Sequence, residues 1–126
     1  GEACKDLIIN REKYFKHFKE LTSKLLSELV LSKLDFKING SVEKRIPNNL
    51  NVSIKGKVAE QLFNHIPHIA LSSGSACTSG TIERSHVLSA MNLDEERIDG
   101  SFRISTGRST TKEEIKKLIK SLQDNA

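Results

Sequence analysis

The first thirty residues predict one long amphipathic helix. From Glu2 to Leu31, apolar side chains recur at intervals of three, four and seven, the spacing of a single helix face. These side chains are Leu7, Tyr14, Phe18, Leu21, Leu25 and Leu29. Lysines and glutamates fill other positions, so we expect the opposite face of this helix to be in water.

Three stretches alternate apolar and polar residues, as half-buried strands do. Residues 34–38 alternate weakly and stop at Asn39-Gly40, a strong turn signal. A polar connection that contains Pro47 follows. Residues 50–54 and 101–105 alternate more clearly. We therefore expect three or more short strands.

Shorter helices are predicted between and after these strands. One spans about residues 58–66 and ends before Pro67, because the residue before a proline avoids helical torsion angles. The short apolar run 69–71 then leads into a glycine-containing stretch. A short helix is expected from about Ser85, and residues 94–99 are expected to form a turn or a helical fragment.

The last helix opens at a capping box formed by Thr111 and, three residues later, Glu114. Its buried stripe consists of Ile115, Leu118, Ile119 and Leu122. Together, these elements predict a single α+β domain over residues 1–126, in which helices cover one face of a small, largely antiparallel sheet. A chain of 126 residues is long enough to bury roughly two-thirds of its unfolded surface.

Charge and composition argue against a nucleic-acid-binding protein. The 20 Lys and Arg against 16 Asp and Glu give a net charge of +4, and the lysines share their predicted helices with glutamates, as on a solvated face. Only 5% of residues are aromatic, which leaves few platforms for base stacking. Without a signal peptide or a long apolar run, we expect a soluble protein. Because the sequence begins at Gly1, we also expect a piece of a longer chain.

Residues 72–80, Ser-Ser-Gly-Ser-Ala-Cys-Thr-Ser-Gly, are the stretch best suited to chemistry. A cysteine is nucleophilic only as its thiolate, which must be accessible and stabilised by nearby groups. The small, hydroxyl-bearing neighbours of Cys77 permit both, and Gly74 and Gly80 allow the backbone to turn on either side. The alternative for Cys77 is a small buried cysteine without a chemical role. For Cys4 we expect an ordinary core or surface cysteine. No CxxC pair is present, so a reducing compartment is favoured over a zinc or disulfide framework.

Arg103 and Arg108 are candidate ligands for a small anion, because a guanidinium binds a carboxylate or phosphate through two parallel hydrogen bonds. The alternative for each is a surface ion pair. The acidic residues available for such a pair are Asp94, Glu95, Glu96 and Asp99. None of the four histidines has the spacing of a metal ligand, so no metal site is expected. His86 is either a partner of the thiolate or an exposed helix residue.

Residues 72–79 resemble the active-site loop of the cysteine desulfurases of the iron-sulfur assembly class, pyridoxal-phosphate enzymes that take sulfur from L-cysteine. Other stretches resemble the same family in the same order. They are Gly1-Glu2-Ala3, Asn39-Gly40, Pro47-Asn48, residues 50–53, Glu83 with Val87-Leu88, Arg103 with Ser105, Gly107-Arg108, Thr110-Thr111 and residues 113–115. The resemblance covers nearly the whole chain. It corresponds only to the C-terminal small domain of such a fold-type I enzyme.

This resemblance implies roles for four residues. Cys77 would be the nucleophile that attacks the γ-sulfur of the cysteine–cofactor adduct, so that L-alanine leaves and a persulfide remains on Cys77. Arg103 would hold the α-carboxylate of the substrate. Ser75 and Thr78 would lie near the phosphate of the cofactor. The thiol must also carry its sulfur outward, and the flanking glycines could serve as hinges.

The resemblance also implies a homodimer that passes sulfur to an iron-sulfur scaffold protein, in the cytoplasm or the mitochondrial matrix, without nucleic acid or membrane. The family's large domain, with its Schiff-base lysine, is missing, since Val87 and not lysine follows Ser85-His86. A tail that helps to dock the scaffold is missing as well. We therefore expect the isolated chain to bind no cofactor and to turn over no cysteine. A stand-alone persulfide carrier or thiol sensor is the second hypothesis. A structural or anion-binding domain with an incidental cysteine is the third.

Overall fold

The computed structural model describes residues 1–73 and 84–125, and the predicted elements lie in these ranges close to their expected positions. In chain order they are α1 (Glu2–Leu31), β1 (Phe36–Ile38), β2 (Asn49–Ile54), α2 (Ala59–His65), α3 (His86–Ala90), α4 (Glu95–Asp99), β3 (Ser101–Ser105) and α5 (Lys112–Asn125). Residues 94–99, expected as a turn or a helical fragment, form the short helix α4 behind an Asp94 cap. The capping box at the start of α5 is confirmed, because Thr111 and Glu114 each accept a hydrogen bond from the other's backbone N–H.

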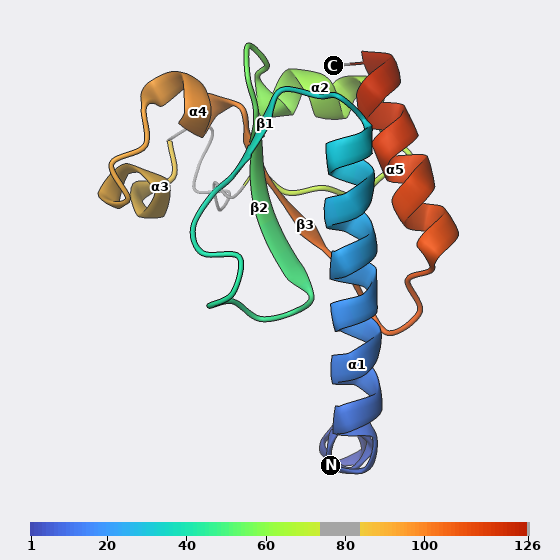
Figure 1. Cartoon of the computed structure of the whole chain (residues 1–126). Coiled ribbons are helices and arrows are strands. Elements are labelled where there is room, and N and C mark those ends of the chain that lie inside the picture. Colours follow the sequence, from blue (N-terminus) through green and yellow to red (C-terminus); the bar gives the residue numbers. More distant parts are fainter. Residues whose placement is uncertain (74–83, 126) are drawn as a thin grey trace.

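The three strands form one antiparallel sheet in the order β1-β2-β3 (Figure 1). The register places Ile38 opposite Val52 and Asn51 opposite Arg103. Because side chains alternate along each strand, β2 and β3 place apolar residues on one face of the sheet and polar residues on the other. The predicted α+β class is confirmed.

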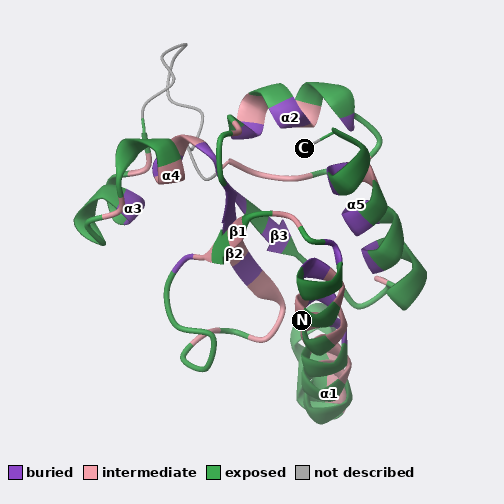
Figure 2. Cartoon of the chain, turned by 45° about the horizontal axis from the view of Figure 1, so that its top comes forward, coloured by how far each residue is buried: buried purple, intermediate pink, exposed green. Residues whose placement is uncertain are grey.

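The apolar face of the sheet is covered by helices, as predicted. Figure 1 shows α1 and α5 side by side on one side of the sheet, whereas α3 and α4 lie on the other side. Figure 2 shows many of the buried positions, in purple, on the strands and on the helices that cover this face. The core comprises Leu50, Val52, Ile54, Phe102 and Ile104 from the sheet and Leu21, Leu25, Leu29, Ala59, Leu62, Ile66, Ile115, Leu118, Ile119 and Leu122 from helices and adjoining chain.

The opposite face of the sheet carries amides and hydroxyls, and one end of it is sealed by α4. The side-chain nitrogen of Asn39 lies 2.6 Å from Asn51 Oδ1, 2.7 Å from Ser53 Oγ and 3.0 Å from Ser101 Oγ. Asn39 Oδ1 in turn accepts a hydrogen bond of 2.8 Å from Arg97 Nε of α4. Buried polar groups need such partners, so this network fixes α4 against the sheet.

Gly100 joins α4 to β3 at a point where two backbone segments pass very close. A Cβ atom at this position would lie 2.6 Å from the carbonyl oxygen of Ile54 and 2.8 Å from that of Lys57. Both atoms belong to the backbone, so neither can move aside as a flexible side chain can. Only glycine allows α4 to lead directly into β3 here.

We expect Gly100→Ala to lower the free energy of unfolding by about 1–3 kcal/mol, because the added methyl group forces the ends of β2 and β3 apart. Gly107→Ala is the matched control, since the nearest atom to its Cβ would be Thr110 Oγ1 at 3.8 Å. Urea denaturation of both variants measures the difference. Equal unfolding midpoints would show that the close approach at residue 100 has no energetic consequence.

Candidate functional site

Arg103 is the central residue of β3, an outer strand, and lies on the polar face of the sheet. Its neighbours in β3, Phe102 and Ile104, are buried in the core, so alternation turns the Arg103 side chain to the opposite face, where it is exposed. Asn51 lies directly across from it in β2. Among the described residues, no carboxylate lies within ion-pairing distance of Arg103. The surface ion pair expected as its alternative is therefore not found there, and the guanidinium is accessible to an anion.

Ser72 pairs with Arg103 along the outer edge of β3. The Arg103 N–H donates to the Ser72 carbonyl oxygen at 2.6 Å, and the Ser72 N–H lies 3.5 Å from the Arg103 carbonyl oxygen. Arg103 Nη2 is also 3.4 Å from Ser72 Oγ. The chain therefore enters the glycine-rich stretch directly beside Arg103. Residues 74–83, which include the predicted site residues Ser75, Cys77 and Thr78, lie outside the described residues.

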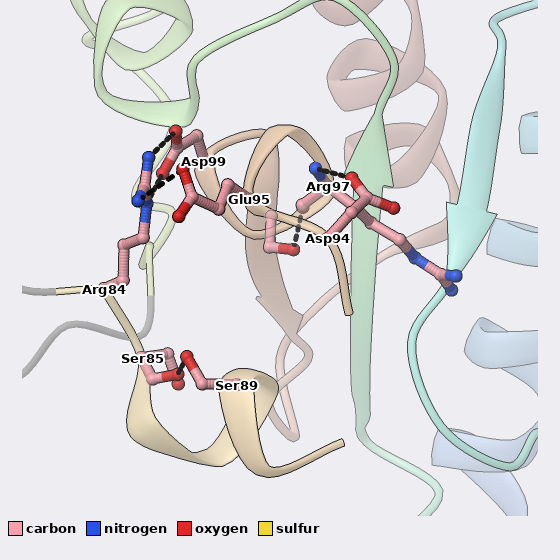
Figure 3. A network of polar contacts seen from close by, with 8 residues as sticks. Arg84, Ser85, Ser89, Asp94, Glu95, Arg97 and Asp99 are labelled. Carbon is pink, nitrogen blue, oxygen red and sulfur yellow. Dashed lines mark hydrogen bonds and ion pairs between the residues drawn. The ribbon is translucent and has the colours of Figure 1, made fainter. Parts of the chain in front are cut away.

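Arg84 holds the chain on the far side of that stretch. Its Nε and Nη2 atoms donate to the two carboxylate oxygens of Asp99, each at 2.8 Å, and its Nη1 lies 2.9 Å from Glu95 Oε2 (Figure 3). These hydrogen bonds hold the pKa of Asp99 below its ordinary value and raise that of Arg84. The alternative considered for Arg103 and Arg108 was an ion pair with these acidic residues, but Glu95 and Asp99 pair with Arg84.

Sequence reasoning did not single out Arg84. Glu95 and Asp99 are four residues apart on one short helix, so both carboxylates can face the same cation. The spacing of these two carboxylates was the signal available in the sequence for a bound cation. It could not identify that cation, because several arginines could have filled the role. Gly100 joins α4 directly to β3, the strand that carries Arg103. Arg84 binds to α4 and Ser72 pairs with β3, so both residues contact this one segment of the chain.

Arg108 forms an ion pair with a residue of α1. Its Nη1 lies 2.6 Å from Asp6 Oδ2, and its guanidinium lies 5.5 Å from the ring centre of Tyr14. The Tyr14 hydroxyl donates to the same carboxylate, and this hydrogen bond is the main reason why the pKa of Asp6 is lowered. The ion-pair alternative was right for Arg108, but the partner is in α1 and not in α4.

The remaining candidate groups do not gather at this face. His86 is exposed at the start of α3, and Cys4 is a free, exposed thiol on α1. Within residues 1–73 and 84–125, no three His, Cys, Asp or Glu side chains lie close enough together to hold a metal ion. None of the helices in these ranges is both long and apolar enough to span a membrane.

The chain is similar in sequence to cysteine desulfurases, although no family model matches it. It is 39% identical to the cysteine desulfurase IscS of Vibrio vulnificus over 123 residues, which cover 98% of this chain and 30% of that protein. The mitochondrial cysteine desulfurase of Arabidopsis thaliana is 42% identical over 120 residues, which cover 94% of this chain and 26% of that protein. The IscS of Aeromonas hydrophila is 48% identical over 88 residues, which cover 70% of this chain and 22% of that protein.

Solved structures give the same result. A NifS-like protein superposes with a TM-score of 0.77 at 28% identity, over 93% of this chain and 29% of that one. DndA from Streptomyces lividans superposes with a TM-score of 0.59 at 33% identity, over 82% of this chain and 29% of that one. In each comparison the chain spans less than a third of its relative. The resemblance seen in the sequence is confirmed: this chain is homologous to one part of the cysteine desulfurases.

Proposed function

We propose that this chain supplies the sulfur-accepting thiol and the substrate-carboxylate ligand of a pyridoxal-phosphate-dependent cysteine desulfurase. Cys77 is the thiol and Arg103 is the carboxylate ligand. The observation that carries the proposal is the backbone pairing of Ser72 with Arg103. Cys77 follows Ser72 by five residues, and an extended chain rises at most about 3.6 Å per residue, so the Cα of Cys77 is tethered within about 18 Å of the Cα of Ser72, the residue paired with Arg103.

Arg103 suits the carboxylate of an amino acid in charge and in geometry. Its described neighbours, Asn51 and Ser72, are uncharged, so the guanidinium has a positive charge that a single carboxylate can neutralise. Two parallel N–H···O bonds fix the orientation of the bound group as well as its position. A small anion held in this way presents its side chain in a defined direction, as transfer of a sulfur atom requires.

The described part of this site fits the substrate end of the reaction and not the Schiff-base end. Asn51 and Ser72, the described neighbours of Arg103, carry no amine, and the lysine that holds the cofactor is proposed to come from the larger part of the relatives that this chain does not match. Ser75 and Thr78 would contact the cofactor phosphate. When bound, pyridoxal phosphate supplies the electron sink that makes the carbon–sulfur bond of the substrate labile.

The chemical step on this chain is the attack of the Cys77 thiolate on the sulfur of L-cysteine held at Arg103. A sulfur–sulfur bond forms, the carbon–sulfur bond breaks, and the three-carbon product leaves as L-alanine after it takes up a proton. Cys77 then carries a persulfide. We further propose that the complete enzyme is a homodimer in the cytoplasm or mitochondrial matrix, and that it passes this sulfur to an iron-sulfur scaffold protein.

The role of Cys77 can be tested on the 126-residue chain with sodium tetrasulfide as the sulfur donor. The thiolate takes one sulfur atom from the tetrasulfide, which leaves as a trisulfide. We expect mass spectrometry to find the added sulfur on Cys77 about tenfold faster than on Cys4, because the serine and threonine neighbours of Cys77 stabilise a thiolate.

Two variants serve as controls for this measurement. Cys77→Ser should remove the fast reaction, and Cys4→Ser should leave it intact. Equal rates at the two cysteines would contradict the nucleophilic role of Cys77. A persulfide on Cys77 without alanine formation in the assembled enzyme would instead favour a stand-alone sulfur carrier.

The role of Arg103 is tested by alanine release from L-cysteine in the assembled enzyme. A charge-assisted hydrogen-bonded pair contributes about 1.5–3 kcal/mol, so Arg103→Ala should lower kcat/KM roughly ten- to a hundredfold. Arg103→Lys keeps the charge but loses the two parallel hydrogen bonds, so its kcat/KM should lie between that of the unsubstituted enzyme and that of Arg103→Ala. Lys37→Ala removes an exposed cation from the same face of the sheet and should have little effect. If Arg103→Ala behaves like Lys37→Ala, the carboxylate is bound elsewhere.

A further inference from the structure

Asn51 is the residue of β2 that lies directly beside Arg103. The backbone N–H and C=O groups of Arg103 both face Ser72, on the outer side of β3, so no backbone hydrogen bond joins Arg103 to Asn51. Opposite residues of this kind approach more closely than hydrogen-bonded ones, with Cα atoms about 4.5 Å apart. Their side chains are therefore near neighbours, and the half-buried Asn51 amide lies next to the exposed Arg103 side chain on the polar face.

Arg97 determines the orientation of the Asn39 amide. A guanidinium can donate hydrogen bonds but cannot accept them. Arg97 Nε lies 2.8 Å from the Asn39 side chain, so the Asn39 atom that it meets is the oxygen, and the other atom is the nitrogen. Asn39 is 5% exposed, and its side-chain nitrogen contacts the hydroxyls of Ser53 and Ser101 at 2.7 and 3.0 Å. The Asn39 amide is therefore held with its NH2 group over the polar face.

Asn39 in turn determines the orientation of the Asn51 amide. Its NH2 group lies 2.6 Å from the Asn51 side chain and can only donate, so the Asn51 atom that it meets is Oδ1. The backbone N–H of Asn39 also donates to the Asn51 carbonyl oxygen at 2.9 Å. Because Oδ1 is turned toward Asn39, the NH2 group of Asn51 is turned away from it. In the described part of the chain, this NH2 group has no hydrogen-bond partner.

The cross-strand pairs on either side of Asn51 and Arg103 form hydrogen bonds between their own side chains. Asn49 Nδ2 donates to Ser105 Oγ at 3.1 Å, and the hydroxyl oxygens of Ser53 and Ser101 are 2.9 Å apart. The side chains of the middle pair do not bond to each other, because the groups that both turn to this part of the face are donors. Two adjacent sets of N–H groups are thus directed at one place that holds no acceptor among the described residues.

We propose that the Asn51 NH2 group donates a hydrogen bond to the substrate carboxylate that Arg103 holds. This inference rests on the proposed function. A carboxylate has about four acceptor positions, and a guanidinium fills two of them. Because Asn39 already holds the Asn51 amide, the bound carboxylate gains a third hydrogen bond without the entropic cost of ordering a free side chain. Asn51 is thus a second substrate-binding residue, and Asn39 and Arg97 are positioning residues.

The arrangement also favours one class of ligand. A primary amine without a carboxylate would leave the guanidinium and the amide without an acceptor. Sites that bind through donors of this kind reject analogues that lack the acceptor, because the donors then lose their water without gaining a partner. We therefore expect Asn51 to contribute to selection of α-amino acids over the corresponding amines.

The test compares Asn51→Ala with the unsubstituted chain in the assembled enzyme. A contact made equally in the bound substrate and in the transition state changes KM and not kcat. We expect KM for L-cysteine to rise about tenfold, with kcat changed less than about twofold, because the lost hydrogen bond is to a charged group. The inhibition constant of L-alanine should rise by a similar factor. Ethylamine, which is L-alanine without its carboxylate, should inhibit both enzymes equally.

Asn49→Ala is the matched control. It removes the same amide from the same strand and face, and it also breaks a side-chain hydrogen bond, the one to Ser105. We expect KM and the inhibition constant of L-alanine to stay as they are in the unsubstituted enzyme. An equal rise in both variants, or an unchanged KM in Asn51→Ala, would overturn the proposal. A rise in the inhibition constant of ethylamine as large as that of L-alanine would overturn it too.

Asn39→Asp tests the positioning role without any change at Asn51. Aspartate has nearly the same shape but no N–H group, so it accepts hydrogen bonds from both Arg97 and Asn51. The Asn51 amide would then turn its oxygen toward the substrate carboxylate. We expect KM to rise at least as much as in Asn51→Ala, and the double variant to show no further rise. Effects that multiply in the double variant would show that Asn39 does not act through Asn51.

The side-chain amide of Asn51 offers a measurement that does not depend on turnover. In nitrogen-15 NMR spectra of the 126-residue chain, acetate should shift the NH2 signals of Asn51 and leave those of Asn49 unchanged. Arg103→Ala should abolish this shift. A shift of the Asn49 signals equal to that of Asn51, or a shift that persists in Arg103→Ala, would contradict a shared carboxylate site.

The outcomes separate this inference from the proposed function. If Arg103→Ala lowers kcat/KM and Asn51→Ala has no effect, the desulfurase role stands and the role of Asn51 is overturned. If acetate shifts the Asn51 signals but the assembled enzyme forms no alanine, the shared carboxylate site is supported and the desulfurase role is contradicted.

Discussion

The alternation of β2 and β3 between an apolar and a polar face is the constraint on which the rest of this structure depends. Val52 and Phe102 on one face hold the sheet to α1 and α5 by burial of apolar surface. On the other face, alternation leaves Asn51 and Arg103 away from the core. The same pairing of two strands therefore provides both the stability of the fold and an accessible guanidinium on a rigid support.

The hydrogen bonds of the polar face attach α4 to the sheet and pair the acidic residues of α4 with Arg84. At one end of the sheet, hydrogen bonds of Asn39 and Arg97 hold α4 in place. Arg84 engages the carboxylates of Glu95 and Asp99, and the carboxylate of Glu96 accepts a hydrogen bond from the Gly56 N–H. Arg97 thus fixes α4 to the sheet, and Arg84 pairs with two of the three carboxylates of α4.

Much of the fold follows from local signals in the sequence. The bounds of α1 and β3 and the capping box at Thr111 could be predicted, because periodicity and caps act over a few residues. The site could be predicted only in part. The motif around Cys77 identified the family, but the contacts of Ser72 with Arg103 and of Arg108 with Asp6 join residues 31 and 102 positions apart. Such pairs depend on how the elements pack, and no local pattern specifies them. The roles of Cys77, Ser75 and Thr78 remain predictions.

The bridge at Ser72 has a consequence for the solubility of the fold. β3 is an outer strand of the sheet, and unpaired N–H and C=O groups along such a strand can recruit another chain and start aggregation. Ser72 occupies these groups at Arg103, the centre of β3. The opposite outer strand, β1, is only three residues long and has Lys37 in its middle. Neither outer strand therefore presents a long, uncharged row of free backbone N–H and C=O groups to another chain. The polar face can stay accessible while the strand edges resist pairing with a second molecule.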